Sequence, residues 1–465
     1  MKILLIVDYY YPNVGGAETL YQKLAESLAA KHEVVVLTQQ ISGAQSEEVL
    51  NGVRIVRIAT WHRALFPYQA FKAALSLLDG VDIIQAATYS AAVLAARLRS
   101  FTKAKVVLIV HEYLAKRWLS LGLAGLSAFF YERYVFSFSF DHYVAVSQST
   151  KRQLLARGIG DDQVTVITNG IDSQLFVSQR APEGLRASLG ISDQAKLFLF
   201  AGRPGVTKGG ELLISAWQQA QLPSDAVLLL ILGSEPLGKR RKLVALAARG
   251  VAHTIKIIDS VERSLLPQYL AMADVITVPS LTEGFGFFAA EACAMHLPIV
   301  ITPVDALPEV VSGRVIVSAD CTIGSFAAAL QAAYRNEFQS LSAKTFSWTN
   351  TAEGYLALYK RCVGGFCGQC TAHSYSSIIV GGLFCYYCVW HGLSVLSCLY
   401  AYSDNCRSGR GTTCWCAFLC ERSYSSLAQE GSGKSICVYP CMSKSILRYY
   451  RELYCAEPSQ YQSIC

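Results

Sequence analysis

Short runs of apolar residues alternate with amphipathic segments along most of the chain. In the first half, the apolar runs lie at 3–7, 34–37, 53–58, 83–84, 106–110, 143–146 and 164–167. Compact runs of this kind are typical of strands that are buried on both faces of a parallel sheet. Between them, apolar positions repeat at helical spacing, for example in 91–98 and 150–156. The pattern predicts βαβ units, in which helices cover both faces of a parallel sheet.

The same alternation weakens after residue 172 and restarts at residue 197, and Pro182 and Gly184 mark the interval as a linker. The second series of apolar runs lies at 197–201, 227–232, 255–258, 275–278, 299–301 and 315–317, and a final helix is predicted at 345–360. We therefore expect two Rossmann-like, doubly wound α/β domains, 1–184 and 185–344. Ligands of such sheets bind at the carboxyl ends of the strands, so the main site is expected in a cleft that the two domains face.

Composition separates the last 104 residues from the rest of the chain. Of the 16 cysteines, 14 lie in 362–465, and no Asp, Glu, Lys or Arg occurs between Arg361 and Asp404. This segment is biased toward Cys, Ser, Tyr and Gly and has no periodicity. It is predicted to be an irregular Cys-rich tail, for which we favour out-of-frame translation. The alternatives are a zinc-binding segment, because Cys-x2-Cys pairs begin at residues 367 and 385, and a membrane anchor.

The net charge of +7 divides into +5 before residue 362 and +2 after it. This excess is too diffuse for a nucleic-acid interface, and no nucleic-acid partner is expected. The apolar content excludes disorder in residues 1–361, and two cysteines exclude a disulfide scaffold there. Only five apolar residues precede Asp8, too few for a signal peptide, so we expect a cytoplasmic protein.

Two glycine-containing loops follow predicted strands. Gly15 and Gly16 open the first helix, where glycines allow close backbone approach and free N–H groups can bind an anion; a tight turn is the alternative. The second loop begins at Gly202 and carries Arg203 and Lys208. Two cations five residues apart at the end of a strand can converge on one polyanion, whereas a solvated basic turn is the simpler alternative.

Two carboxylates follow the run 275–278. Glu283 lies in a loop with Gly284, Phe285 and Gly286, and Glu291 follows eight residues after Glu283, inside an apolar helix. An unpaired charge at Glu291 would be costly. This carboxylate is therefore expected either to form an ion pair with a neighbour or to accept hydrogen bonds from a ligand diol, and we favour the diol.

His111 ends the run 106–110 and is expected to face the cleft, although a lone histidine in such a position is more often structural. Before residue 362 the sequence has no CxxC, HExxH or paired-histidine spacing. A metal site is therefore not expected in this part of the chain.

Taken together and in this order, the motifs resemble those of the retaining nucleotide-sugar glycosyltransferases of the GT-B fold, in particular the GT4 family. The resemblance covers residues 1–361. It rests on the loop 15–18, His111, the segments 144–147 and 169–172, Arg203 with Lys208, Glu283-x7-Glu291 and the segment 346–348.

The resemblance implies an N-terminal domain for the acceptor and a C-terminal domain for a UDP- or GDP-sugar, with no metal or other cofactor. The helix 345–361 would return to the N-terminal domain. Arg203 and Lys208 would neutralise the donor diphosphate, Glu291 would accept from the ribose, and Glu283 would contact the sugar. His111 and the Gly15-Gly16 loop would line the reaction centre, and the donor would also contact Gly202, Gly284, Phe285 and Gly286.

The implied activity is transfer of a sugar, with retention of configuration, to a glycan or lipid-linked acceptor in the synthesis of cell-surface polysaccharide or glycolipid. A catalytically silent nucleotide-sugar-binding protein of the same fold is one alternative, and a nucleotide-sugar epimerase or hydrolase is another. The uncharged segment 118–130 has basic neighbours. It is predicted to be a buried helix or a peripheral contact with the inner face of the cell membrane.

Several positions depart from the family pattern. His296 and Asp305 stand where glycine is usual, Gln85 stands where many relatives carry histidine, and the loop at 312–314 is shortened. An aspartate beside a diphosphate site is unfavourable unless its carboxylate points away. The substitution at Gln85 is expected to be tolerated, whereas the other departures predict either a modified donor pocket or a lower activity.

Overall fold

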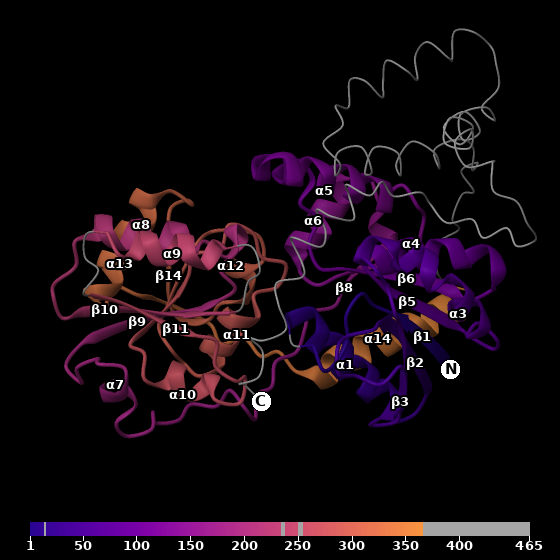
Figure 1. Cartoon of the computed structure of the whole chain (residues 1–465), viewed down its shortest axis with the longest axis horizontal. Coiled ribbons are helices and arrows are strands. Elements are labelled where there is room, and N and C mark those ends of the chain that lie inside the picture. Colours follow the sequence, from indigo (N-terminus) through magenta and orange to yellow (C-terminus); the bar gives the residue numbers. More distant parts are fainter. Residues whose placement is uncertain (14, 234–237, 250–253, 366–465) are drawn as a thin grey trace, which may run out of the picture. The chain divides into compact units, whose positions relative to one another are not determined.

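The computed structural model describes residues 1–13, 15–233, 238–249 and 254–365, except for the side chains of residues 120, 121, 123 and 124. It contains two separate sheets, each formed by one of the two series of apolar runs (Figure 1). The predicted Cys-rich tail begins at residue 362, but α14 continues to Val363. Residues 366–465, on which the frameshift, zinc-binding and membrane-anchor alternatives depend, lie outside the described residues.

The first sheet has the strand order β3-β4-β2-β1-β5-β6-β7-β8. Every neighbouring pair is parallel except β3 with β4, which is antiparallel. Its strands are β1 (Lys2–Ile6), β2 (Glu33–Gln39), β3 (Glu47–Leu50), β4 (Val53–Ile58), β5 (Ile83–Ala87), β6 (Lys105–Val110), β7 (His142–Ala145) and β8 (Val164–Val166).

The second sheet has the strand order β11-β10-β9-β12-β13-β14-β15, and only β15 is antiparallel to its neighbour. Its strands are β9 (Lys196–Gly202), β10 (Ala226–Leu232), β11 (Ile255–Asp259), β12 (Val275–Val278), β13 (Ile299–Ile301), β14 (Gly313–Val317) and β15 (Gln339–Leu341). The predicted doubly wound α/β class is therefore confirmed.

Helices cover both faces of the second sheet (Figure 1). Residues of α8, α9 and α13 form one buried apolar cluster with the strands, and residues of α10 and α11 form another. The helices of the described residues are α1 (Gly16–Ala29), α2 (Phe66–Gln69), α3 (Phe71–Ser76), α4 (Ser90–Leu98), α5 (Gly122–Val135), α6 (Gln148–Ala156), α7 (Leu185–Ser188), α8 (Gly210–Ala220), α9 (Lys239–Ala247), α10 (Leu266–Ala271), α11 (Phe287–Ala294), α12 (Leu307–Val310), α13 (Ile323–Tyr334) and α14 (Trp348–Val363).

The last helix, α14, belongs to the core of the first sheet. Its buried residues Tyr355, Leu358 and Tyr359 lie in the same apolar cluster as β1 and β5. The Tyr359 hydroxyl donates to Oε1 of Gln85 at 2.9 Å, while Nε2 of Gln85 donates to the carbonyl of Val107. Gln85, one of the departures from the family pattern, is thus a buried and hydrogen-bonded part of this core.

The uncharged segment 118–130 is not a single buried helix. A 3₁₀ helix spans Ala115–Leu121, and α5 begins at Gly122. Leu119 and Phe130 are about half exposed, at 46% and 51%. In the described part of the chain, no helix combines the length and the apolar character that crossing a membrane requires.

His296 lies where the backbone favours glycine. It follows α11 with a φ of 59°, and the Leu297 N–H donates to the carbonyl of Ala292. This left-handed geometry at the end of a helix explains why glycine suits the position. The His296 backbone adopts this left-handed conformation at the cost of strain, and the His296 side chain is exposed.

Replacing His296 with glycine is expected to raise the free energy of unfolding by about 0.5–1 kcal/mol. The relief of left-handed strain, about 1–2 kcal/mol, exceeds the entropy cost of glycine. Urea denaturation measures the change. The control is Asn336→Gly, because Asn336 also follows a helix, with a φ of 60°, and asparagine tolerates this conformation better. An unchanged or lower stability of His296→Gly contradicts the prediction.

Candidate functional site

The predicted donor residues lie at the carboxyl edge of the second sheet. Arg203 directly follows β9, and Glu283 lies in the loop after β12, the parallel neighbour of β9. The two loops are joined by a hydrogen bond from the Leu281 N–H to the carbonyl of Thr207. A Cβ on Gly209 would lie 1.8 Å from the carbonyl oxygen of Pro279, so only glycine permits this contact. The fold thus brings the basic loop and the acidic loop together.

Lys208 and Glu283 form an ion pair. The Lys208 Nζ lies 3.0 and 2.8 Å from the two carboxylate oxygens of Glu283, and the Ser280 hydroxyl donates to the same carboxylate at 3.0 Å. The Glu283 side chain is 13% exposed and that of Lys208 is 32% exposed. Lys208 therefore neutralises Glu283 in this arrangement.

Arg203 differs from Lys208 in having no ionic partner among the described residues. Its side chain is exposed and forms no ion pair with any residue that the structure describes. Gly202, immediately before it, ends β9, and its carbonyl accepts from the Gly233 N–H at 3.1 Å. The Arg203 guanidinium is thus available to an anion at the edge of the sheet.

Glu291 is buried in α11, where it is only 2% exposed. Its Oε1 forms an ion pair with Nη2 of Arg263. Burial raises the pKa of the Glu291 carboxyl, and Arg263 opposes this shift. The observed contact is the ion pair that the sequence left open, and the favoured role toward a ligand diol stays a prediction. Arg263 belongs to no sequence motif and was not among the predicted site residues.

His111 lies against α1 and against the loop after β12. Its Nε2 is hydrogen-bonded to the hydroxyl of Tyr21, and a Cβ on Gly284 would lie 2.1 Å from its carbonyl oxygen. A Cβ on Gly16 would likewise lie 2.8 Å from the ring of Phe287. Glycine at position 16 therefore allows the start of α1 to approach Phe287 closely, and glycine at position 284 allows the loop after β12 to approach the backbone of His111. The structure brings His111 and Gly16 next to the loop that carries Glu283.

The other predicted residues have structural surroundings. Gly15 precedes α1, and its carbonyl accepts from the Thr19 N–H at 2.9 Å. The buried ring of Phe285 packs edge-on against Phe346, with centroids 5.2 Å apart. Gly286 precedes α11 with a φ of 95°, which requires glycine. These residues shape the loop around Glu283.

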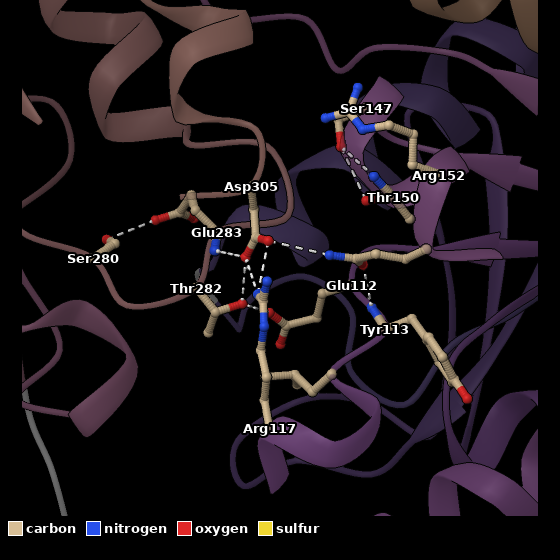
Figure 2. A network of polar contacts seen from close by, with 12 residues as sticks. Glu112, Tyr113, Arg117, Ser147, Thr150, Arg152, Ser280, Thr282, Glu283 and Asp305 are labelled. Atoms are coloured by element: carbon tan, nitrogen blue, oxygen red, sulfur yellow. Dashed lines mark hydrogen bonds and ion pairs between the residues drawn. The ribbon is translucent and has the colours of Figure 1, made fainter. Parts of the chain in front are cut away.

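Asp305 is the centre of a polar network, which Figure 2 shows. Its carboxylate accepts from Nη1 of Arg117 at 2.7 and 2.8 Å and from Nε2 of Gln153 at 3.2 Å. It also accepts from the Thr282 hydroxyl at 2.9 Å and from the Glu283 N–H at 3.1 Å. The negative charge of Asp305 is therefore compensated, which explains how an aspartate is accommodated beside the predicted donor loop.

A second bridge lies beside this network. Glu309 accepts from the Gln148 N–H at 2.8 Å and from Nη2 of Arg152 at 2.9 Å. Glu112, which follows His111, is half-buried, and its desolvation together with the nearby Glu283 raises the pKa of its carboxyl. Glu112 was not among the predicted site residues, although its place directly after His111 was a usable signal.

Burial lowers the pKa of His111 from 6.5 to about 4. Between these two pH values the unfolded chain binds more protons than the folded chain. We therefore expect the free energy of unfolding to fall as the pH drops from 6.5 toward 4, by about 3 kcal/mol from His111 alone. At neutral pH the imidazole is uncharged and acts through hydrogen bonds.

To test this expectation, the free energy of unfolding is measured by urea denaturation at several pH values for the wild type and for His111→Gln. Burial also lowers the pKa of His142 to about 4, so part of the pH dependence stays in the variant. An NMR titration of the imidazole signals supplies the midpoint of His111 directly. Identical pH profiles for the two proteins contradict the prediction.

Two family models match the chain. The model for Glycosyltransferase Family 4 matches residues 14–175, and the model for Glycosyl transferases group 1 matches residues 195–336. An uncharacterised glycosyltransferase of Methanocaldococcus jannaschii is 29% identical over 332 residues, which are 68% of this chain and 84% of that protein. A D-inositol 3-phosphate glycosyltransferase of Jonesia denitrificans is 28% identical over 43% of this chain, and the match spans about half of that relative, 52%.

Three solved structures that are similar to this chain illustrate the fold: a named synthase, a synthase with bound ligands, and a protein with a bound nucleotide and sugar. Sucrose-phosphate synthase of Thermosynechococcus elongatus has a TM-score of 0.59 at 20% identity, covering 79% of this chain and 97% of that one. Starch synthase IV of Arabidopsis thaliana, bound to ADP and acarbose, has a TM-score of 0.60 at 15% identity over 78% and 99%. Anabaena HepE, in complex with UDP and glucose, has a TM-score of 0.59 at 18% identity over 78% and 96%.

At these identities the solved structures show the fold alone, and they confirm the GT-B architecture that the motifs predicted. The two family models follow each other along the chain and together match more than half of it. The named relatives are glycosyltransferases, which supports a transferase. The chain therefore belongs to the GT4 family of GT-B glycosyltransferases.

Proposed function

We propose that this protein transfers a sugar from a nucleoside-diphosphate sugar to a glycan or lipid-linked acceptor. The main support is the pair of adjoining loops at the carboxyl edge of the second sheet. One loop presents Arg203 without an ionic partner among the described residues, and the other presents Glu283 paired with Lys208. An unpaired guanidinium is suited to phosphate oxygens, and a carboxylate is suited to sugar hydroxyls.

The reaction requires stabilisation of negative charge on the leaving diphosphate. When the bond between the anomeric carbon and the diphosphate oxygen breaks, charge develops on that oxygen. Cations that are already in place stabilise this charge most strongly in the transition state. In the proposed mechanism Arg203 and Lys208 have this role, and Glu283, released from part of its contact with Lys208, contacts the sugar.

We further propose that the acceptor binds near His111 and Gly16. Its hydroxyl oxygen attacks the anomeric carbon from the face that the diphosphate leaves and gives its proton to the departing diphosphate oxygen, so configuration is retained. The uncharged His111 can orient a hydroxyl group. The proposed mechanism uses no metal ion, and among the described residues no three His, Cys, Asp or Glu side chains gather into a potential metal site. The proposed place of the reaction is the cytoplasmic face of the membrane, in polysaccharide or glycolipid synthesis.

A panel of donors tests the proposal. The purified full chain is incubated with UDP-, GDP- and ADP-sugars, with and without glycan and lipid-linked acceptors, and released nucleoside diphosphate is measured. Release that depends on an acceptor, with one donor preferred, supports the transferase. Release of nucleoside diphosphate without an acceptor indicates a hydrolase, and conversion of the donor into another nucleotide-sugar, followed by chromatography, indicates an epimerase. Donor binding without any turnover indicates a silent binding protein, and each of these results contradicts the proposal.

A further inference from the structure

A hollow of about 510 Å³ lies on the N-terminal half of the chain, between the segment after β6, helix α5 and helix α6. Four cations and two aromatic rings contribute to its walls: Lys116, Arg117, Arg133, Arg157, Tyr113 and Phe129. We call it the basic hollow. Its volume lies within the range of small-molecule sites.

The positive charge of the basic hollow is poorly compensated. Among the described residues, no carboxylate lines it, and of its four cations only Arg117 forms an ion pair, with Asp305. Lys116 and Arg133 are exposed and form no ion pair with any described residue. Nε of Arg157 is buried and has no hydrogen-bond partner in the described part of the chain. Clustered cations with so few counter-charges attract an anion.

The wall of the basic hollow is held in place from behind. The buried Glu132 accepts from the N–H groups of Leu114 and Ala115, at 3.1 and 2.7 Å, and from Nε1 of Trp118 at 3.0 Å. Ala115 has a φ of 48°, a strained conformation for a residue with a side chain. Tertiary contacts thus impose the shape of this segment, and its side chains are held in position before any ligand binds. The Glu132 charge lies behind the wall and offsets only part of the four cations.

The basic hollow also adjoins the network around Asp305. Arg117 and Gln153 both line the hollow, and both donate to the Asp305 carboxylate. The same carboxylate accepts from the Glu283 N–H. An anion in the hollow would therefore lie next to the loop on which the proposed sugar donor binds.

We propose that the basic hollow binds a phosphate group of the acceptor. Guanidinium groups bind phosphate oxygens in bidentate fashion, and Lys116 adds a point charge. Arg117 already forms an ion pair with Asp305. Most of the contacts to the phosphate therefore come from the other three cations, Lys116, Arg133 and Arg157. This inference rests on the proposed transferase function and narrows its acceptor to a phosphate-bearing molecule. The phosphate can belong to a lipid headgroup or to a soluble compound.

The test uses inorganic pyrophosphate as the probe, in the full chain carrying Arg203→Gln so that the donor site contributes little. Its dissociation constant is measured by calorimetry with and without the double substitution Lys116→Gln and Arg133→Gln. Both side chains are exposed, so folding should be unaffected. We expect binding to weaken about tenfold or more, because charge-assisted contacts to phosphate are lost. The matched control is Lys31→Gln with Lys72→Gln, two exposed lysines outside the hollow.

Sedimentation with vesicles distinguishes the two sources of phosphate. Binding to phosphatidylcholine vesicles that contain phosphatidic acid, lost in the Lys116/Arg133 variant, supports a lipid phosphate. Binding of pyrophosphate without any binding to vesicles supports a soluble acceptor. Equal pyrophosphate affinity in the hollow variant and the control variant, or no binding at all, overturns the proposal. Failure of the proposed transferase function would instead appear as a lack of turnover with every donor. The binding measurements do not depend on turnover, so the two failures can be distinguished.

Discussion

Replacing Arg203 with alanine is expected to lower kcat/KM for sugar transfer by about 100- to 1000-fold, the usual effect of removing one preorganised group that stabilises transition-state charge. Arg203 is exposed at the end of β9 and forms no ion pair with the described residues, so its loss should leave the fold intact. Kinetic measurements with the preferred donor, together with thermal denaturation, check both expectations.

The matched control for this substitution is Arg249→Ala. Arg249 is also exposed, but it follows α9, which leads from β10 into β11, so it lies at the opposite edge of the same parallel sheet. Activity should be close to wild type in the control. If Arg203→Ala retains wild-type kcat/KM, or if both variants lose activity equally, Arg203 does not contact the leaving diphosphate.

Replacing Glu291 with alanine is expected to reduce the affinity for the nucleotide-sugar about 100-fold, because two ribose hydroxyls lose a charged acceptor. The ion pair with Arg263 complicates this prediction, since Glu291 is buried and breaking a buried pair destabilises the fold. Donor binding therefore has to be compared at a temperature where each variant is folded, as judged by circular dichroism.

Arg263→Gln separates the two roles of Glu291. It removes the same ion pair but keeps the Glu291 carboxylate as an acceptor, so donor affinity should stay within a few-fold of wild type. Arg263 is the more exposed partner, with 35% of its side chain accessible against 2% for Glu291. Its removal leaves the buried Glu291 carboxylate without a counter-charge, so the donor affinity of this variant is also measured at a temperature where the variant is folded. Equal losses of affinity in Glu291→Ala and Arg263→Gln would show that Glu291 acts only through the ion pair.

The parallel strands of both sheets were predictable from local sequence, and the two antiparallel edge strands were not. Every apolar run used in the prediction lies in or overlaps a strand, because a strand buried on both faces needs uninterrupted apolar residues. The missed strands, β3 and β15, are four and three residues long, pair antiparallel at sheet edges and have no fully buried residue. Their pairing depends on the neighbouring strand rather than on their own apolar content.

The residues of the site could be predicted from the sequence, but only some of the contacts between them could. Spacing at the ends of strands pointed to Arg203, Lys208 and Glu283. The same spacing did not reveal that Lys208 pairs with Glu283, since these residues are 75 positions apart in sequence. Asp305 was expected to be unfavourable, and its partner Arg117, 188 positions away, shows why it is not.

By itself, the sequence determined which segments form the two parallel sheets and which residues lie at their carboxyl edges. These properties follow from apolar periodicity and from glycine-containing loops, which act over a few neighbouring residues. Only the tertiary structure decided which charges are paired, as in Glu291 with Arg263, and which are available, as in Arg203 and the basic hollow. Ion pairing depends on distances of a few ångströms between side chains that are far apart along the chain, and local sequence patterns do not contain those distances.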